Sequence, residues 1–154
     1  MNKISRDTPL MELTLRRYER PQQGNERELV RKFCLSIGLL QPGDSRDVIV
    51  DVLYVLLQAK KERVALSSDE IKEHVIVLRK EYNKPLHGIA GSNIRRQIKR
   101  LKDLLLIEKV RNAYRITEFA DMSDNFEHKI EQFILPSIIE RVKEYFQRVD
   151  RVFS

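Results

Sequence analysis

The side chains best suited to chemistry in this sequence are cationic, and they concentrate between Gly91 and Thr117. This stretch holds eight of the 29 Lys and Arg residues but only two acidic ones, so its net charge of +6 equals that of the whole chain. The rest of the sequence balances, with 21 basic against 21 acidic residues. A basic excess confined to one segment predicts a surface for a polyanion.

Other reactive side chains are few and scattered. Cys34 is the only cysteine, which excludes an internal disulfide, and its place on an apolar stripe predicts a small buried hydrophobe. We expect His74 to be packed and His87 to lie in a turn. His128 follows Asp124 by four residues, but two ligands are too few for a metal site. With no glycine-rich phosphate loop and no nucleophile motif, we expect a non-enzyme without metal or cofactor.

Length and composition predict a mainly α-helical domain with extensions. The 154 residues are 42% hydrophobic and 34% charged, with five Gly, five Pro and no Trp. No apolar run approaches the roughly 20 residues that a membrane span needs. The first ten residues lack the apolar core of a signal peptide. Together with the single cysteine, these features predict a cytoplasmic protein.

The basic residues must be positioned by a helix and a hairpin. Ser92 or Asn93 is expected to cap a basic helix over 92–105, whose buried stripe is Ile94, Ile98, Leu101 and Leu105. Arg96, Lys99, Arg100 and Asp103 fall on the opposite side, flanked by Arg95 and Lys102. Residues 106–117 change to a period of two, which predicts a hairpin with Arg111-Asn112-Ala113 at its turn. Asn112 tolerates the left-handed conformation that a tight hairpin needs.

The segments before residue 44 are expected to form helices. In residues 9–20, Met11, Leu13 and Leu15 alternate as in a strand, whereas Met11, Leu15 and Tyr18 have helical spacing. Thr8-Pro9 is a good helix start and favours the helix. A second helix begins after Asn25, with Glu28 completing a capping-box pattern. Its predicted apolar stripe is Leu29, Phe33 and Ile37, widened by Val30 and Cys34.

Two helices precede the basic helix. The first runs from a cap at Asp44 or Ser45 to about Lys61 and is apolar over most of its circumference, so we expect it at the centre of the core. Residues 64–66 are short and apolar, as in a brief strand. Ser67 and Glu70 form a capping box that starts the next helix, which ends near Tyr82. That helix is expected to bury Ile71, Val75 and Leu78.

A long helix is predicted from Ser123 to the end of the chain, kinked or split at Pro136. Its apolar residues recur at spacings of three and four: Leu135, Ile138, Val142, Tyr145, Val149 and Val152. Ile139, Phe146 and Phe153 widen this face beyond a simple coiled-coil seam. The face either completes the core of one chain or pairs with a second copy. We favour a homodimer, because symmetric self-association is the usual outcome for such a surface.

Three segments resemble the winged helix-turn-helix superfamily, in the form found in archaeal and bacterial transcription regulators. They read ALSSDEIKEHV, SNIRRQIKRLKDLLLIEKV and YRITEF. The resemblance implies a small strand and second helix, then a recognition helix leading into the first wing strand, then the returning wing strand. It covers residues 45–119, roughly half of the chain. One departure is the stretch from Tyr82 to Gly91, which is longer than the usual tight turn.

The expected fold is therefore mainly α with a small β-hairpin wing, in three parts. Residues 1–43 form an N-terminal helical extension, residues 44–120 the winged helix-turn-helix domain, and residues 121–154 a C-terminal helix for dimerisation. Terminal-helix dimers are common in the family, so the resemblance implies the same here. Such a dimer would present its two recognition helices to half-sites about 34 Å apart, or a multiple of that distance.

We expect a transcriptional regulator that binds duplex DNA, because the major groove admits one α-helix whose outward side chains meet bases and phosphates. The expected contacts are Ser92, Asn93, Arg95, Arg96, Lys99, Arg100, Lys102, Arg111, Asn112 and Arg115. A basic helix face also serves solubility alone. A second hypothesis is a protein-interaction module of a nucleic-acid-processing assembly, with partners docked on residues 1–40 and on the apolar C-terminal helix. RNA binding ranks lower, because Tyr114 is the only aromatic residue of the basic stretch.

Overall fold

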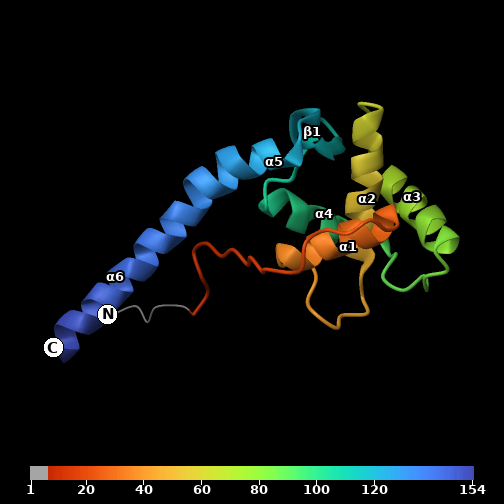
Figure 1. The fold of residues 1–154 in the computed structure, drawn as a ribbon. Helices are drawn as coiled ribbons and strands as arrows, with labels where there is room; N and C mark the ends of the chain where they lie inside the picture. Colours follow the sequence, from red (N-terminus) through yellow and green to blue (C-terminus); the bar gives the residue numbers. More distant parts are fainter. Residues whose placement is uncertain (1–6) are drawn as a thin grey trace.

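A computed structural model describes residues 7–154, which are mainly helical with one two-stranded antiparallel hairpin. The body of the molecule contains α1 (Glu26–Ser36), α2 (Val48–Lys61), α3 (Ser68–Glu81), α4 (Gly91–Asp103), β1 (Ile107–Val110) and β2 (Ala113–Ile116). A 3-10 turn, η1 (Thr117–Phe119), leads to α5 (Met122–Asn125), the π-helical segment η2 (Phe126–Ile134) and α6 (Leu135–Phe153). Figure 1 shows that α6 projects away from the body.

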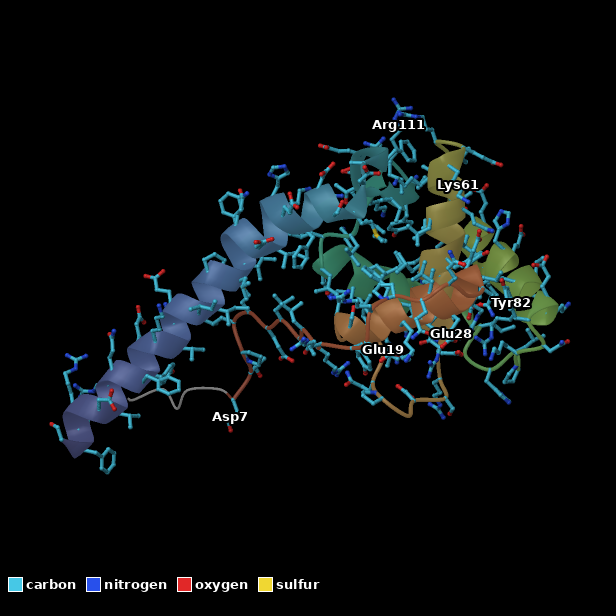
Figure 2. All side chains as sticks on the ribbon, in the orientation of Figure 1. Asp7, Glu19, Glu28, Lys61, Tyr82 and Arg111 are labelled. Atoms are coloured by element: carbon cyan, nitrogen blue, oxygen red, sulfur yellow. The ribbon has the colours of Figure 1, made fainter. Side chains whose placement is uncertain are left out.

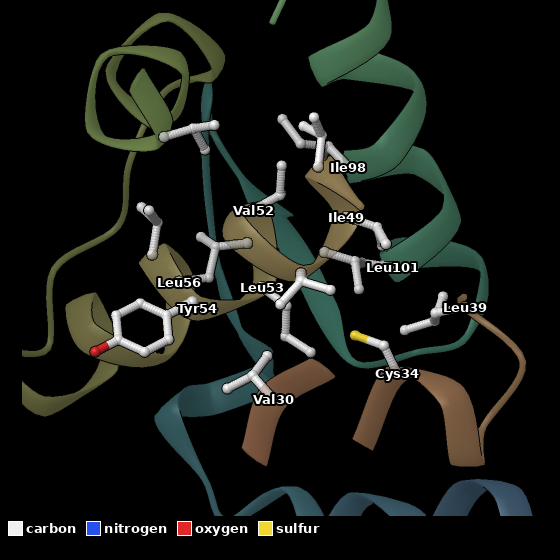
Figure 3. Close-up of a cluster of buried hydrophobic side chains, with 14 of the residues drawn as sticks. Val30, Cys34, Leu39, Ile49, Val52, Leu53, Tyr54, Leu56, Ile98 and Leu101 are labelled. Carbon is white, nitrogen blue, oxygen red and sulfur yellow. The ribbon is translucent and has the colours of Figure 1, made fainter. Parts of the chain in front are cut away.

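Helix α2 is the centre of the core, as its all-round apolar character predicts. Every residue from Val48 to Leu56 is buried, and the helix packs against α1, α3, α4 and β2. Figure 3 shows its side chains between Cys34 of α1 and Ile98 of α4. The helix starts at Val48 and not after Asp44 or Ser45. Asp47 occupies the cap position without capping, because its carboxylate binds two arginines instead.

The predicted start of α3 is confirmed, whereas the brief strand predicted for residues 64–66 is present only as a single β-bridge at Leu66. Ser67 Oγ accepts from the Glu70 backbone N–H at 3.2 Å, and the Glu70 carboxylate accepts from the Ser67 N–H at 3.0 Å. Ile71, Val75 and Leu78 are buried as expected. Just before this cap, Leu66 and Tyr114 exchange backbone hydrogen bonds of 2.9 and 2.7 Å. This pairing ties the loop between α2 and α3 to the hairpin.

Helix α1 begins at its predicted cap but buries a different face. Asn25 accepts from the Glu28 N–H at 2.7 Å, whereas the Glu28 side chain binds Arg31 and does not close a capping box. The buried residues are Arg27, Val30, Cys34 and Leu35, whereas Leu29 of the predicted stripe is 53% exposed. The apolar pattern alone was misleading, because the carboxylates of α2 draw Arg27 inward and thereby set the rotation of the helix.

The helix predicted for residues 9–20 is wrong: this segment is extended, so within residues 7–43 the N-terminal extension is helical only over Glu26–Ser36. Arg16 explains the difference. Its backbone N–H donates to the Ser36 carbonyl at 2.8 Å, and its guanidinium donates to the Leu35 and Leu40 carbonyls at 2.7 and 3.1 Å. These carbonyls lie at or just beyond the end of α1, where intrahelical donors run out. A long-range contact therefore overrides the local helix signal.

A buried cluster of four charges joins α1, α2 and α3. Arg27 binds Asp47 and Asp51 at 2.9 Å each, and Arg79 binds the same two carboxylates at 3.0 and 2.6 Å. None of these side chains is more than 11% exposed. Burial disfavours the charged form of Asp47, but the hydrogen bonds from Arg27 and Arg79 outweigh it and lower the Asp47 pKa.

The last part of the chain is helical from Met122, one residue before the predicted start, through to Phe153. Figure 1 shows one continuous helix through α5, η2 and α6. Pro136 lies in the first turn of α6, directly after the π-helical segment. Proline has no N–H to donate and crowds the preceding turn, and a π-helical widening accommodates both effects. Among residues 7–154, no helix has the length and apolar character that a membrane crossing requires.

Candidate nucleic-acid interface

Helix α4 is attached to the core by one apolar side. Ile94, Ile98 and Leu101 are at most 2% exposed and lie against α2, as predicted. Leu105 was expected to continue this stripe, but it is 39% exposed and has a positive φ of 62°. The helix ends at Asp103, and the turn into β1 gives the buried position to Leu106, which is 3% exposed.

The first turn of α4 is held by Asn93 rather than capped by it. The helix begins at Gly91, so Ser92 and Asn93 lie inside its first turn. The Asn93 amide donates to the Gly88 carbonyl at 2.7 Å and accepts from Gln97 at 3.0 Å. These bonds join the preceding turn to the helix and occupy the Asn93 side chain. Ser92 is exposed at the helix N-terminus, where backbone N–H groups favour an anion.

Four cations project from the exposed side of α4. Arg95, Arg96 and Lys102 are exposed and have no anionic partner among residues 7–154. Lys99 pairs with Asp103 at 3.0 Å, and both side chains are more than 60% exposed. Exposed pairs of this kind contribute only about 0.3–0.5 kcal/mol. A phosphate can therefore replace Asp103 as the partner of Lys99 at little cost.

Arg100, predicted to project away from the domain, turns toward it. Its guanidinium donates to the Leu39 carbonyl at 2.7 Å and to the Gln97 side chain at 2.8 Å. The side chain is half-buried, and it links α4 to the segment that follows α1. Helical spacing alone placed Arg100 outward. The Leu39 carbonyl, 61 residues away in sequence, directs it inward.

The hairpin has the predicted strands but a different residue in the left-handed position. Val110 pairs with Ala113, so Arg111 and Asn112 form the loop. Arg111 has a φ of 59°, whereas Asn112 does not adopt a positive φ. The expectation that Asn112 takes the left-handed conformation is therefore wrong. Both side chains are exposed at the tip of the hairpin, where they can reach a neighbouring molecule.

Arg115 is occupied within the hairpin. It donates to the Glu108 carboxylate at 2.8 Å, and its guanidinium lies 4.8 Å from the centre of the Phe119 ring. Burial opposes ionisation of Glu108, but the Glu118 backbone N–H and the Arg115 side chain outweigh it and lower the Glu108 pKa. Arg115 therefore fixes the base of the hairpin, and Arg111 is the arginine at its tip.

One further cation near the hairpin was not predicted. Figure 2 shows Lys61, at the end of α2, and Arg111, at the hairpin tip, extending at the same end of the molecule. Lys61 is exposed. Nothing in the sequence pattern relates residues 50 positions apart, and the pairing of Leu66 with Tyr114 brings them to one end. The exposed cations of α4, together with Arg111 and Lys61, are called the cationic surface below: Arg95, Arg96, Lys99, Lys102, Arg111 and Lys61.

The residues predicted for a dimer interface lie together on α6, and no residue of this helix is buried. Leu135 and Ile138 are half-buried, and the other four are between 47% and 70% exposed: Val142, Tyr145, Val149 and Val152. Within residues 7–154, no set of three or more His, Cys, Asp or Glu side chains is arranged to hold a metal ion. The chemistry that these surfaces offer is ionic binding on α4 and apolar contact on α6.

Comparison with known proteins identifies no relative. The sequence matches no family model, and comparisons with curated proteins and with solved structures give no significant match. The charge, exposure and contacts of the side chains on α4, the hairpin and α6 are therefore the basis for assigning a function.

Proposed function

We propose that this protein is a cytoplasmic transcriptional regulator that binds duplex DNA as a homodimer through a winged helix-turn-helix domain. One observation carries the proposal. The outward side of α4 presents Arg95, Arg96, Lys99 and Lys102, while Ile94, Ile98 and Leu101 hold the opposite side in the core. A helix attached in this way can enter a groove without unfolding the domain.

The order of elements supports the winged-helix assignment. Helix α2 is followed by a single β-bridge at Leu66, then α3, α4 and the β1–β2 hairpin. In this assignment α4 is the recognition helix and the hairpin is the wing. The long turn between α3 and α4 is held at two points, by the bond from Arg79 to the Pro85 carbonyl and the bond from Asn93 to the Gly88 carbonyl. These bonds anchor the turn to α3 and to α4.

The cationic surface suits a DNA duplex. The major groove admits an α-helix, and the guanidinium groups of Arg95 and Arg96 match the acceptor pair on guanine. Lys99 and Lys102 are suited to the phosphates on either side of the groove. Arg111 on the wing and Lys61 at the end of α2 would contact the phosphate backbone of the DNA outside the major groove. Each phosphate neutralised changes the slope of log affinity against log salt by about −0.9.

The apolar side of α6 supports self-association. Tyr145, Phe146 and Phe153 are 70%, 69% and 83% exposed, although large apolar side chains of this kind normally cover one another. Helices in proteins derive most of their stability from packing of an amphipathic face, and that packing is missing along α6 in a single chain. A second α6 would supply it.

A triple substitution tests the DNA interface. In the variant Arg95→Ala/Arg96→Ala/Lys102→Ala, we expect affinity for a mixed-sequence duplex to fall about 100-fold, at roughly 1 kcal/mol for each lost contact. The salt slope should become shallower by about 0.9, because Lys102 is the one residue of the three that is assigned to a phosphate. Mobility-shift titrations at two salt concentrations measure both quantities, and circular dichroism verifies that the fold is intact.

The matched control is Arg20→Ala/Lys143→Ala/Arg151→Ala, which removes three exposed charges away from α4 and the wing. We expect this variant to bind DNA nearly as well as the parent. Equal binding by the parent and the α4 variant would rule out α4 as the interface. Tighter binding of duplex or single-stranded RNA than of duplex DNA, in the same titration, would contradict DNA as the partner.

A further inference from the structure

We infer that two copies of α6 pair in parallel and in register, so that Arg141 and Arg148 of each helix contact the partner's Phe146 and Phe153. The inference rests on the proposed homodimer and adds the orientation of its two chains. The parallel orientation follows from the apolar residues along the centre of the α6 face and from the different side chains on its two flanks.

The centre of the face is an uninterrupted seam. The seam residues alternate at spacings of three and four, which is the heptad repeat of coiled coils: Leu135, Ile138, Val142, Tyr145, Val149 and Val152. None of the six is charged, and none is buried within the single chain. A repeat of this regularity is complementary to itself, because each seam residue packs into a hole formed by the same helix of a second copy. The occupant that fits is therefore another α6.

The two flanks of the seam differ in chemistry. Arg141 and Arg148 lie one position before Val142 and Val149. On the other flank, Ile139, Phe146 and Phe153 lie one position after seam residues. In a parallel two-stranded coil, these two flanking positions face each other across the pair, offset by five residues. Arg141 then meets the partner's Phe146, and Arg148 meets the partner's Phe153.

An antiparallel pair would join the flanks differently. Like flanks then face each other, which brings the arginines of both helices together on one side. Like charges repel, whereas a guanidinium over an aromatic ring is attracted to it. The same chain already contains such contacts: Arg115 lies 4.8 Å from the ring centre of Phe119, and Arg27 lies 6.0 Å from that of Tyr82. The arrangement of charges and rings favours the parallel pair.

The first half of the seam borders a groove of about 910 Å³, with Ile138, Val142 and Tyr145 on one side and residues 7–11 on the other. Because α6 projects from the body, a parallel pair places both bodies at the same end of the coil. The two α4 helices then lie at that end, whereas an antiparallel pair would separate the bodies by at least the roughly 28 Å length of α6.

Disulfide trapping of the full chain tests the orientation. Val149 occupies a seam position that meets its own counterpart only in a parallel, in-register pair. Oxidation of Val149→Cys should therefore convert most of the protein into a covalent dimer on a non-reducing gel. Cys34 does not interfere, because it is 0% exposed and burial raises its pKa to about 12. Gln147→Cys, on the outer side of α6, is the control and should remain monomeric on the gel.

An equimolar mixture of Ile138→Cys and Val149→Cys distinguishes an antiparallel pair from the parallel pair. These positions face each other in an antiparallel pair centred on α6. A mixed covalent dimer, without cross-linking of Val149→Cys alone, would overturn the parallel orientation and leave the proposed homodimer standing. A parent chain that is monomeric by light scattering would overturn both the orientation and the homodimer, and DNA binding would still be judged separately by mobility shift.

Discussion

Helices α4 and α6 are both strongly amphipathic, but the apolar side is covered in α4 and exposed in α6. The apolar side of α4 is covered by α2, and its cations face outward. The apolar side of α6 is uncovered, and no residue of that helix is buried. Amphipathicity by itself therefore does not identify the functional side of a helix. In α4 the exposed side is cationic and is the side proposed to bind DNA, whereas in α6 the exposed side is apolar and is the side proposed to bind a second copy.

The two helices also differ in how they are held. Around α4, polar contacts act at defined points: Asn93 at its start, Arg100 along its length and the buried charge cluster behind it. Among residues 7–154, the part of α6 beyond Ile138 makes no comparable contact with the body, and every residue from 139 to 154 is exposed. Substitutions near α4 should therefore change the stability of one chain, while substitutions on α6 should change association.

The largest effect is expected from Arg79→Met. The variant leaves Asp47 and Asp51 buried with only Arg27 between them, and it removes the bond to the Pro85 carbonyl. Breaking a buried ion pair on one side typically costs about 3–5 kcal/mol of unfolding free energy. Urea denaturation followed by circular dichroism measures the loss. Lys80→Met, which changes the next residue in sequence but an exposed one, is the control. A loss below about 1 kcal/mol for Arg79→Met would show that the charge cluster does not stabilise the fold.

The difference between the buried side of α4 and the exposed side of α6 is tested by Ile98→Ala and Val149→Ala. Ile98 is 2% exposed, so its truncation should lower the unfolding free energy by about 2–4 kcal/mol at any protein concentration. Val149 is 55% exposed, so its truncation should leave the single chain intact and weaken self-association about tenfold. Denaturation and light scattering over a range of concentrations measure the two effects. Similar behaviour of both variants would remove the distinction between α4 and α6.

A smaller effect is expected at Gly38, where the N-terminal segment crosses the end of α1. Its φ is +76°, and an added Cβ would lie 2.5 Å from Thr14 Cβ. Gly38→Ala should therefore cost about 1–2 kcal/mol and loosen residues 12–20, which limited proteolysis would detect. Gly24→Ala is the matched control, because nothing lies within 4 Å of its added Cβ. Equal proteolysis rates in both variants would show that Gly38 does not position the segment.

The smallest expected effect is the acid response of Asp47. Its pKa is lowered in the folded chain, so it contributes stability above its unfolded pKa of about 3.9. That stability is lost as the pH falls from there through the lower folded pKa. Asp47→Asn should therefore show a shallower decline in urea midpoint between pH 5 and pH 2 than the parent. Glu73→Gln, on the exposed side of α3, is the control, and a decline as steep as the parent's in Asp47→Asn would contradict this origin.

The local features of the fold were predictable from sequence. The capping box at Ser67 and Glu70 involves partners three residues apart, and the buried stripe of Ile94, Ile98 and Leu101 follows from helical spacing. The hairpin strands were also correct. Each of these features depends on residues that are close together in sequence, so a short stretch of sequence is enough to predict it.

Three of the errors occurred where distant groups compete with local preference. Arg16 satisfies carbonyls about 20 residues away and so keeps its segment extended. Arg27 turns inward to carboxylates on α2, which rotates the buried face of α1. Arg100 turns away from the cationic surface to reach Leu39. In each case an arginine with several donors finds acceptors that only the folded chain brings near.

The sequence by itself determined that a net charge of +6 lies within residues 91–117, and that the last helix carries a continuous apolar repeat. Only the tertiary structure decided which of those charges are available to a partner: among residues 7–154, Arg95, Arg96 and Lys102 have no anionic partner, while Arg100 and Arg115 are bound within the domain. It also decided that the repeat stays uncovered. Spacing along the chain fixes which side of a helix a residue occupies, but the atoms available to that side depend on the packing of distant segments.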